Sequence, residues 1–248
     1  MNSIARTRPA ASLAAAALLI AATSAAAAQT WSIKNDWSDV NNPTGPWSLR
    51  SSNGALLPFT LRTTNWVTPQ PSWGGFPTWF KSNGTETVGH DWIAGDIVTH
   101  SGPAGDGANQ GLIRWTSPVE GAVNITGNLW WGGVADQFFR ANDWFLQLNG
   151  ISFTGQIGTV GSGSGRGRGN PIDFSEGSGG ISAITSVPVH IGDEIRLLVR
   201  TNANSFGGNG AYTGVNFDIV AVPTPGAAAL LSLAGMAATR RRRGGTPD

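Results

Sequence analysis

The sequence predicts an all-β fold, built as an antiparallel β-sandwich or jelly roll. Charged residues make up only 12% of the 248-residue chain, whereas glycine occurs 35 times and tryptophan 11 times. This composition suits short strands joined by glycine turns better than amphipathic helices. Strand-length runs of β-branched and aromatic residues also recur along the chain, separated by turn residues. Because the chain has no cysteine, its fold must depend on burial of a core rather than on disulfides.

The first 28 residues have the three-part layout of a secretory signal peptide. Arg6 and Arg8 precede an apolar stretch over 11–22, and small residues over 24–28 precede Gln29. The apolar stretch is too short for a good membrane span. We therefore expect export, with signal peptidase cutting before Gln29; a retained N-terminal anchor is the alternative.

Residues 29–87 interleave tryptophan with proline and show no strong periodicity. The prolines exclude long helices. Short alternating pieces, such as 59–62 and 66–67, favour a few short strands between ordered loops. This part has too few strands for a sheet of its own, so we expect one domain over 29–221.

Seven strand-length runs follow, at 97–99, 112–116, 121–131, 144–153, 181–190, 194–200 and 215–222. Turn signals separate them, at 117–121, 149–150, 192–193 and 202–210. Their number and spacing are typical of an antiparallel sandwich or jelly roll. The glycine-rich stretch 161–169 has almost no side chain to bury, so it is expected to be a mobile surface loop.

The C-terminal end begins with the motif Val222-Pro223-Thr224-Pro225. An apolar stretch over 226–239 and the run Arg240 to Arg243 follow it. As a helix the stretch would span about 21 Å, less than the roughly 30 Å of a hydrocarbon core, with the arginines on the cytoplasmic side. This predicts a short hydrophobic helix that anchors the chain only weakly, and transiently, in the inner membrane.

This arrangement resembles the PEP-CTERM sorting signal of Gram-negative bacteria over residues 222–248, with Thr224 where glutamate is commonest. The resemblance implies that an exosortase cuts near Pro223-Thr224-Pro225. The domain would then reach the outer surface or the extracellular matrix of a Gram-negative-type bacterium. A plain C-terminal anchor is the alternative. The sorting residues implied are Val222, Pro223, Thr224, Pro225, Arg240, Arg241, Arg242 and Arg243.

A weaker resemblance concerns the domain itself. Residues 112–127 have the order apolar strand, proline, turn glycine, apolar strand, which is similar to a hairpin of carbohydrate-module-like sandwiches in secreted bacterial proteins. Residues 144–150, 187–195 and 212–219 follow in the same order of elements. The resemblance covers about 110 residues and implies architecture more than function.

Nucleic acid is excluded as a partner by the charge of the domain. Without the terminal signals, 16 Lys and Arg less six leave ten, and 15 Asp and Glu less one leave fourteen, a net charge of −4. Proteins that bind a negatively charged phosphate backbone carry positive charge, whereas this domain is negative.

No catalytic residue is assigned. His90, His100 and His190 are too scattered to propose a triad, and 161–165 fits Gly-x-Ser-x-Gly only within low-complexity sequence with no helix behind it. We assign no cofactor and no metal either, and two alternatives stay open. His90 and His100, with the adjacent Asp91 and Asp96, could form a metal cluster, although exposed loop positions explain them better. The second alternative is a structural calcium ion bound by Asp136, Asp143, Asp173 and Glu176, although solvated loop positions explain these carboxylates better.

The tryptophans are the one indication of a ligand, because flat indole rings stack on sugars. Most are expected in the core. Neighbouring residues of a strand face opposite ways, so only one indole of the pair 130–131 can be core, and the other is exposed or covered by a second layer. The candidate glycan-stacking residues lie beside glycine or proline: Trp73, Trp79, Trp130 and Trp131.

Three functions remain, in descending order. The first is a non-catalytic surface module associated with exopolysaccharide or other glycans. The second is a purely structural matrix protein without a discrete ligand. The third is a secreted glycan-active hydrolase, for which the sequence shows no carboxylate or nucleophile constellation.

Overall fold

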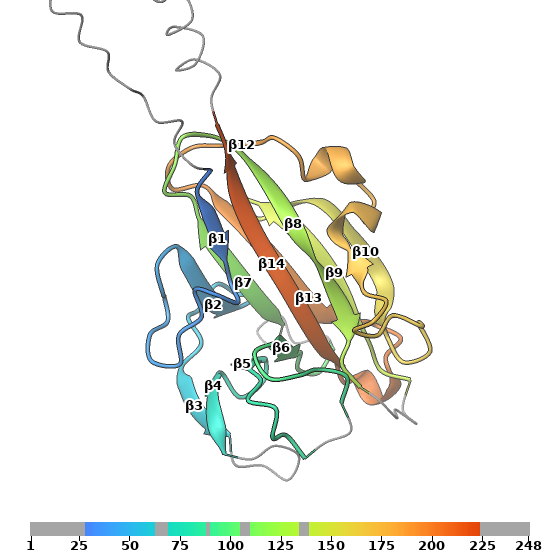
Figure 1. Cartoon of the computed structure of the whole chain (residues 1–248). Helices are drawn as coiled ribbons and strands as arrows, with labels where there is room; N and C mark the ends of the chain where they lie inside the picture. Colours follow the sequence, from blue (N-terminus) through green and yellow to red (C-terminus); the bar gives the residue numbers. More distant parts are fainter. Residues whose placement is uncertain (1–27, 63–68, 88–89, 105–109, 134–138, 224–248) are drawn as a thin grey trace, which may run out of the picture. The chain divides into compact units, whose positions relative to one another are not determined.

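A computed structural model describes residues 28–62, 69–87, 90–104, 110–133 and 139–223 (Figure 1). They belong to one compact unit, 27–225. The all-β part of the predicted fold class is confirmed, because the described chain is built of strands that form two antiparallel sheets. Among these residues no helix has the length and apolarity of a membrane span. The expected signal peptide lies outside the described residues except for Ala28, and so does the expected C-terminal helix.

The N-terminal part contributes five short strands, as the sequence predicted. They are β1 (Thr30–Ser32), β2 (Trp47–Ser51), β3 (Phe59–Arg62), β4 (Gln70–Trp73) and β5 (Thr78–Lys81). The later strands are β6 (Ile97–His100), β7 (Gly111–Thr116), β8 (Gly121–Trp131), β9 (Ala141–Leu148), β10 (Ile151–Gly161), β11 (Ile172–Asp173), β12 (Val187–Val189), β13 (Glu194–Thr201) and β14 (Tyr212–Val222).

The first sheet is built around β14. Its strand order is β11-β8-β14-β6-β5-β4-β3, and β12 pairs with β8. One side of β14 pairs with β8 along its whole length. The other side pairs with β6 over 212–215 and with β1 over 218–220. Of the N-terminal strands, β1, β3, β4 and β5 therefore belong to the first sheet through backbone pairing.

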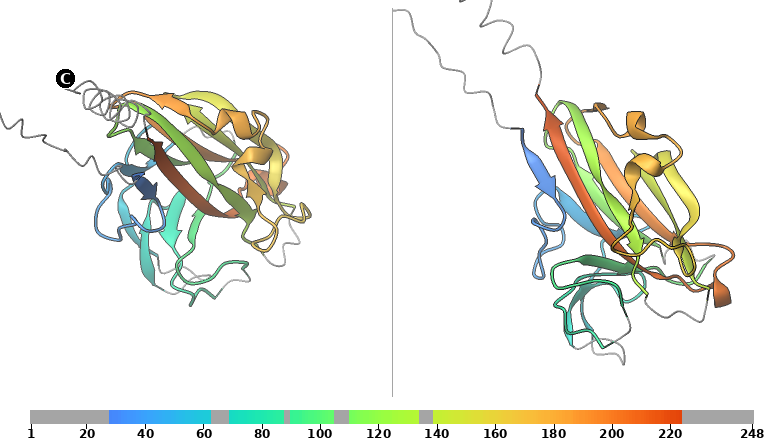
Figure 2. Two further views of the ribbon diagram at one scale, coloured as in Figure 1. Left: turned by 45° about the horizontal axis from the view of Figure 1, so that its top comes forward. Right: turned by 45° about the vertical axis from the view of Figure 1, so that its right-hand side comes forward.

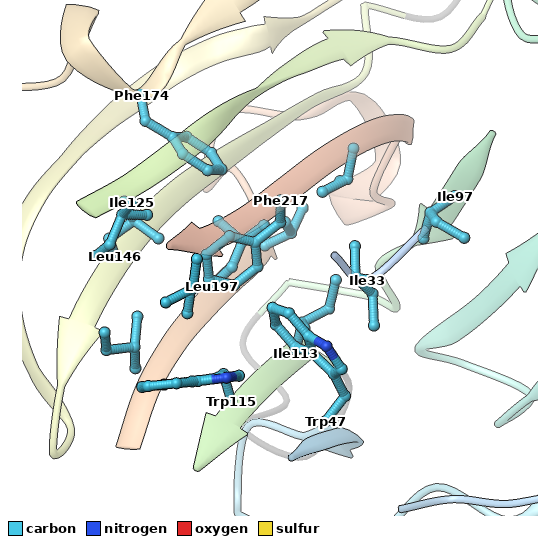
Figure 3. Close-up of a cluster of buried hydrophobic side chains, with 14 of the residues drawn as sticks. Ile33, Trp47, Ile97, Ile113, Trp115, Ile125, Leu146, Phe174, Leu197 and Phe217 are labelled. Atoms are coloured by element: carbon cyan, nitrogen blue, oxygen red, sulfur yellow. The ribbon is translucent and has the colours of Figure 1, made fainter. Parts of the chain in front are cut away.

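The second sheet has the order β10-β9-β13-β7-β2. Its central strand, β13, alternates buried Ile195, Leu197 and Val199 with more exposed neighbours, as a half-buried strand must. Both sheets contribute to one hydrophobic cluster. Figure 3 shows Phe217 and Ile125 of the first sheet facing side chains of the second, and this shared core holds the two sheets together.

The expected hairpin at 112–127 is a connection between the two sheets. β7 pairs with β2 and β13, whereas β8 pairs with β11, β12 and β14. The turn at 117–120 thus carries the chain across the core. The turn after β12 crosses in the other direction, and the two turns bond through the Ser117 amide and the Asp193 carbonyl, 2.7 Å apart. An apolar-turn-apolar pattern fits a hairpin and a crossing equally well, because both place apolar side chains in a core.

Two further sequence predictions need correction. The run 144–153 is not one strand but the end of β9, a turn and the start of β10. The turn predicted at 149–150 is confirmed, since Asn149 and Gly150 have the positive φ values, 51° and 85°, that a tight hairpin turn requires. The run 181–190 is strand only over β12. Residues Ile181–Ala183 form a 3-10 turn instead, after Gly180 at φ 61°.

The two ends of the described chain leave the sheet together. The Ala221 amide donates to the Gln29 carbonyl at 2.8 Å, and Figure 2 shows β1 beside the C-terminal part of β14 in both views. β14 rises about 33 Å over its eleven residues. Its first residue, Tyr212, therefore lies at the opposite end of the strand from this junction.

Candidate functional site

Three of the four candidate stacking tryptophans are buried. Trp73 is 5% exposed, Trp79 0% and Trp130 2%, so none presents a ring face to a sugar in this structure. Their indoles pack against the chain instead; the Trp73 Nε1 donates to the Ser38 carbonyl at 2.9 Å. The broader expectation, that most tryptophans serve the core, is confirmed by burial of eight of them: Trp31, Trp47, Trp73, Trp79, Trp92, Trp115, Trp130 and Trp144.

The neighbouring Trp130 and Trp131 face opposite sides of the first sheet. Trp131 is half-buried and packs against the shared core. Trp130 is covered by a second layer, because its Nε1 donates to the Asp91 carbonyl at 2.7 Å. Its ring lies over Gly214, where a Cβ would come within 2.0 Å of the indole. Of the four candidates only Trp131 therefore keeps partial exposure.

A pocket of about 420 Å³ lies where β14 begins. Tyr212 is paired with His100 across β14 and β6, and both side chains line the pocket. Other lining residues come from four loops: Phe76 lies before β5, Ser101 to Pro103 after β6, Arg140 before β9, and Asn209 before β14. The topology of the sheets alone brings these segments together, since they are spread over more than half of the chain.

The aromatic rings of the pocket form a chain. Phe76 contacts His100 edge-on, with ring centroids 5.2 Å apart, and His100 contacts Tyr212 in the same way at 4.6 Å. Phe76 lines the pocket and is about half exposed. The guanidinium carbon of the buried Arg62 lies 5.7 Å from the Phe76 ring centroid, within cation–π range.

His100 is neutral at pH 7. Burial lowers the pKa of its imidazole to about 4, and the positive charges of Arg140 and Arg62 act in the same direction. Its Nδ1 donates to the Ser101 carbonyl at 2.8 Å. Burial also raises the pKa of Tyr212 above its usual range, so the phenol keeps its proton.

A buried polar network fixes the floor of the pocket. The Asn142 amide donates to the Ala211 carbonyl and to Thr213 Oγ1, both at 2.8 Å, and accepts from Ser101 Oγ at 2.6 Å. Ser101 Oγ also lies 3.0 Å from Thr201 Oγ1. These bonds join β9, β13, β14 and the loop after β6, and they hold the pocket in shape before any ligand binds.

Exposed phenylalanines surround the same end of the molecule. Besides Phe76, Phe139 is 74% exposed and Phe206 is 55% exposed. The Phe206 amide donates to the Phe139 carbonyl at 3.1 Å, and Phe139 directly precedes the pocket residue Arg140. Sequence reasoning favoured tryptophan and missed these residues; the available signal was an aromatic ring inside a turn, as in Gly74-Gly75-Phe76-Pro77.

The histidines do not form the metal cluster that the sequence left open. Among the described residues no three His, Cys, Asp or Glu side chains are grouped to hold a metal ion. The preferred explanation, exposed loop positions, is wrong for His100, which is buried at the end of β6. His90 stacks on Trp92 with ring centroids 4.3 Å apart.

The proposed calcium ligands are engaged separately where the structure describes them. Asp143 accepts from Arg200 Nε at 3.2 Å, and Glu176 pairs with Arg166 at 2.6 Å. The Asp173 amide donates to Glu176 Oε1 at 3.0 Å. Asp136 lies outside the described residues.

The glycine-rich segment 161–169 is held to the domain at several points, contrary to the expected mobile loop. The Arg166 carbonyl accepts from the Trp131 amide at 2.7 Å. The Arg168 guanidinium bonds to Asp96 at 2.7 Å, and Asp96 is 1% exposed. Burial opposes ionisation of Asp96, but hydrogen bonds from Arg168, the Ile93 amide and Lys34 outweigh it and lower its pKa.

Of the sorting residues, the structure describes the first two. Val222 is the last residue of β14 and pairs with Ala122. Pro223 follows it and is exposed. Thr224, Pro225 and Arg240 to Arg243 lie outside the described residues.

Comparison with known proteins gives no match: no family model, no curated protein and no solved structure matches the chain. The function must therefore be inferred from the residues and the pocket themselves.

Proposed function

We propose that this chain is an exported, non-catalytic protein of the cell surface or extracellular matrix. It is sorted through its C-terminal exosortase-type signal, after transient anchoring in the inner membrane, and its domain associates with exopolysaccharide or other glycans. The observation that carries the proposal is that the sorting motif and the aromatic pocket lie at opposite ends of β14. The motif begins at Val222, the last residue of the strand, and the pocket is lined by Tyr212, the first.

We assign the fold to the jelly-roll type of β-sandwich. β6, β14, β8 and β12 are neighbours in the first sheet, and β7, β13, β9 and β10 are neighbours in the second. Along the chain from β6 to β14 most connections pass from one sheet to the other. This order, in which late strands insert between early ones, is that of two interleaved Greek keys and supports the assignment.

The position of the chain ends supports surface display. β1 and the end of β14 are paired, so the signal peptide and the sorting signal join the domain at one place. A domain held in the membrane at either segment would then present its opposite end outward. That end carries the pocket and the exposed Phe76, Phe139 and Phe206.

The lining of the pocket supports a sugar ligand. Sugar rings offer C–H faces that stack on aromatic side chains and hydroxyl groups that need hydrogen-bond partners. The half-exposed ring of Phe76 supplies the first, and the side chains of Arg140 and Asn209 supply the second. The network around Asn142 holds Ser101 of the lining and the backbone at Ala211, next to Tyr212.

The glycan proposal is tested with the exported protein purified from its host, in a glycan array and in a pull-down with host exopolysaccharide. We expect Phe76→Ala to weaken binding at least tenfold. Ile191→Ala is the matched control, because this exposed side chain lies in the β12–β13 turn, at the end of β8 and β14 away from the pocket. Absence of any binding by the parent protein would favour the purely structural matrix role.

The sorting proposal is tested separately by replacing Arg240 to Arg243 with alanine. The variant should be exported but remain unprocessed in the inner membrane, because the arginines hold the short helix across it. Fractionation and the mass of the mature protein measure this. Normal surface maturation of the variant would count against the sorting signal.

A further inference from the structure

The pocket carries positive charge in a domain whose net charge is negative. Arg140 is the one charged residue among its described lining residues, which include no Asp or Glu. Arg62 adds a second guanidinium behind Phe76. Both arginines act electrostatically on the same two pocket residues, His100 and Tyr212. The domain as a whole, these two arginines included, has a net charge of −4.

This positive charge acts in a partly desolvated setting. Arg62 is only 5% exposed, and His100 and Tyr212 are largely buried. Charge pairs interact more strongly where water is excluded. The neutral His100 adds no charge of its own, so the sign of the pocket is set by the arginines. An anionic group entering it would gain more than the same group on the open surface.

We infer that the pocket binds a carboxylate-bearing sugar, such as a uronic acid unit of an acidic exopolysaccharide. The inference rests on the proposed function, that this pocket binds a glycan, and names the class of sugar. A planar guanidinium matches a carboxylate with two parallel hydrogen bonds, and Arg140 supplies it. Phe76 receives the C–H face of the same ring.

The experiment compares two polymers that share one sugar backbone and differ in whether the carboxyl group is ionised or esterified. Polygalacturonate carries a carboxylate on each sugar, and its methyl ester has the same backbone without the charge. The exported protein should bind polygalacturonate at least tenfold more tightly by calorimetry. Added salt should reduce this preference, since part of it is electrostatic. Dextran sulfate, a polymer with sulfate groups, should bind more weakly than polygalacturonate.

Variants test whether the preference for the acidic polymer arises in this pocket. Arg140→Gln should abolish the preference for the acid while leaving binding of the ester, and Arg140→Lys should retain part of it. Arg196→Gln is the matched control for charge, because it lies on the second sheet and its partner Glu194 keeps Arg114. Phe76→Ala should weaken binding of both polymers. Melting curves verify that each variant is folded.

Each other outcome has a defined meaning. Equal binding of both polymers that depends on Phe76 overturns the acid preference and leaves the glycan proposal standing. If the protein binds neither of the two polymers and does not bind host exopolysaccharide, both the acid preference and the glycan proposal are overturned. Equal affinity for dextran sulfate, or an equal loss in Arg196→Gln, shows general attraction of anions and overturns the carboxylate assignment. A preference that survives Arg140→Gln overturns the assignment to this pocket.

Discussion

Asn142 is the residue on which the pocket end of the molecule depends most. It is fully buried, and its side chain bonds to Ala211, Thr213 and Ser101. We predict that Asn142→Ala lowers the free energy of unfolding by about 3 kcal/mol, because several buried polar groups lose their partner at once. Urea denaturation measures the loss.

The control for this substitution is Asn216→Ala. Asn216 is half-buried on β14 and makes one side-chain bond, to Asn128 at 3.0 Å. Its removal should cost about 1 kcal/mol or less. Equal losses for the two variants would show that the network around Asn142 contributes no more than a surface pair.

His100 should make the stability of the domain depend on pH. Its pKa is about 4 in the folded state, against about 6.5 when unfolded. The unfolded chain therefore takes up the proton first as the pH falls. The contribution of His100 is fully present above about pH 6.5 and is lost between about pH 6.5 and 4, by at most about 3 kcal/mol in total.

Urea unfolding at pH 7 and pH 4.5 tests this. His100→Gln should lose less stability than the parent between these values, because it removes the group that binds the proton. Tyr212 and Arg62, which act on the same imidazole, keep their protonation state over this interval. His190→Gln is the comparison variant, because it removes an imidazole that is 77% exposed. An unchanged pH dependence in His100→Gln would contradict the prediction.

At the scale of elements, the segment 161–169 shows how a sequence without bulky side chains is nevertheless placed. Its two arginines bond outward, Arg166 to Glu176 and Arg168 to the buried Asp96. Composition predicted mobility because glycine has no side chain to bury. The composition does not indicate what the arginines reach, since their partners lie elsewhere in the chain.

We predict that Arg168→Ala releases this segment. Asp96 would keep Lys34 and the Ile93 amide, and the Arg168 side chain is itself 38% exposed, so stability should fall by only about 1 to 2 kcal/mol. Limited proteolysis with subtilisin should cut within 161–169 faster than in the parent. Lys34→Ala removes a partner of the same carboxylate but should leave the segment protected. Equal cleavage in both variants would disprove the specific role of Arg168.

The connections that cross between the two sheets show a second limit of prediction from local sequence patterns. Local patterns located the strands around residues 112–131 but did not reveal whether two successive strands pair. Pairing depends on which other strands are available. β7 pairs with β13 and β2, and β8 pairs with β14. These partners are distant in the sequence, so no local signal carries the information.

At the scale of the whole molecule, the N-terminal strands are part of both sheets. β1 pairs with β14, β2 with β7 and β5 with β6. A chain beginning at residue 89 would lose these pairings and several core indoles, each worth several kcal/mol. We predict that it fails to unfold cooperatively in thermal circular dichroism.

The matched control is a chain that begins at residue 29, which keeps all these strands and should unfold in one transition. If the shorter chain melts sharply at the same temperature, the N-terminal part is a separate module. That result would disprove a single domain over 29–221.

The sequence by itself determined the fold class and most strand positions. Alternation of apolar side chains, β-branched residues and turn pairs such as Asn149-Gly150 act over a few residues, so they can be recognised without the fold. The absence of cysteine likewise excluded disulfides from composition alone. The tertiary structure decided which rings are covered and which polar groups meet. Trp130 is buried by the segment at Asp91, and Phe76, His100 and Tyr212 form one pocket, because strand pairing joins residues that are far apart in the chain.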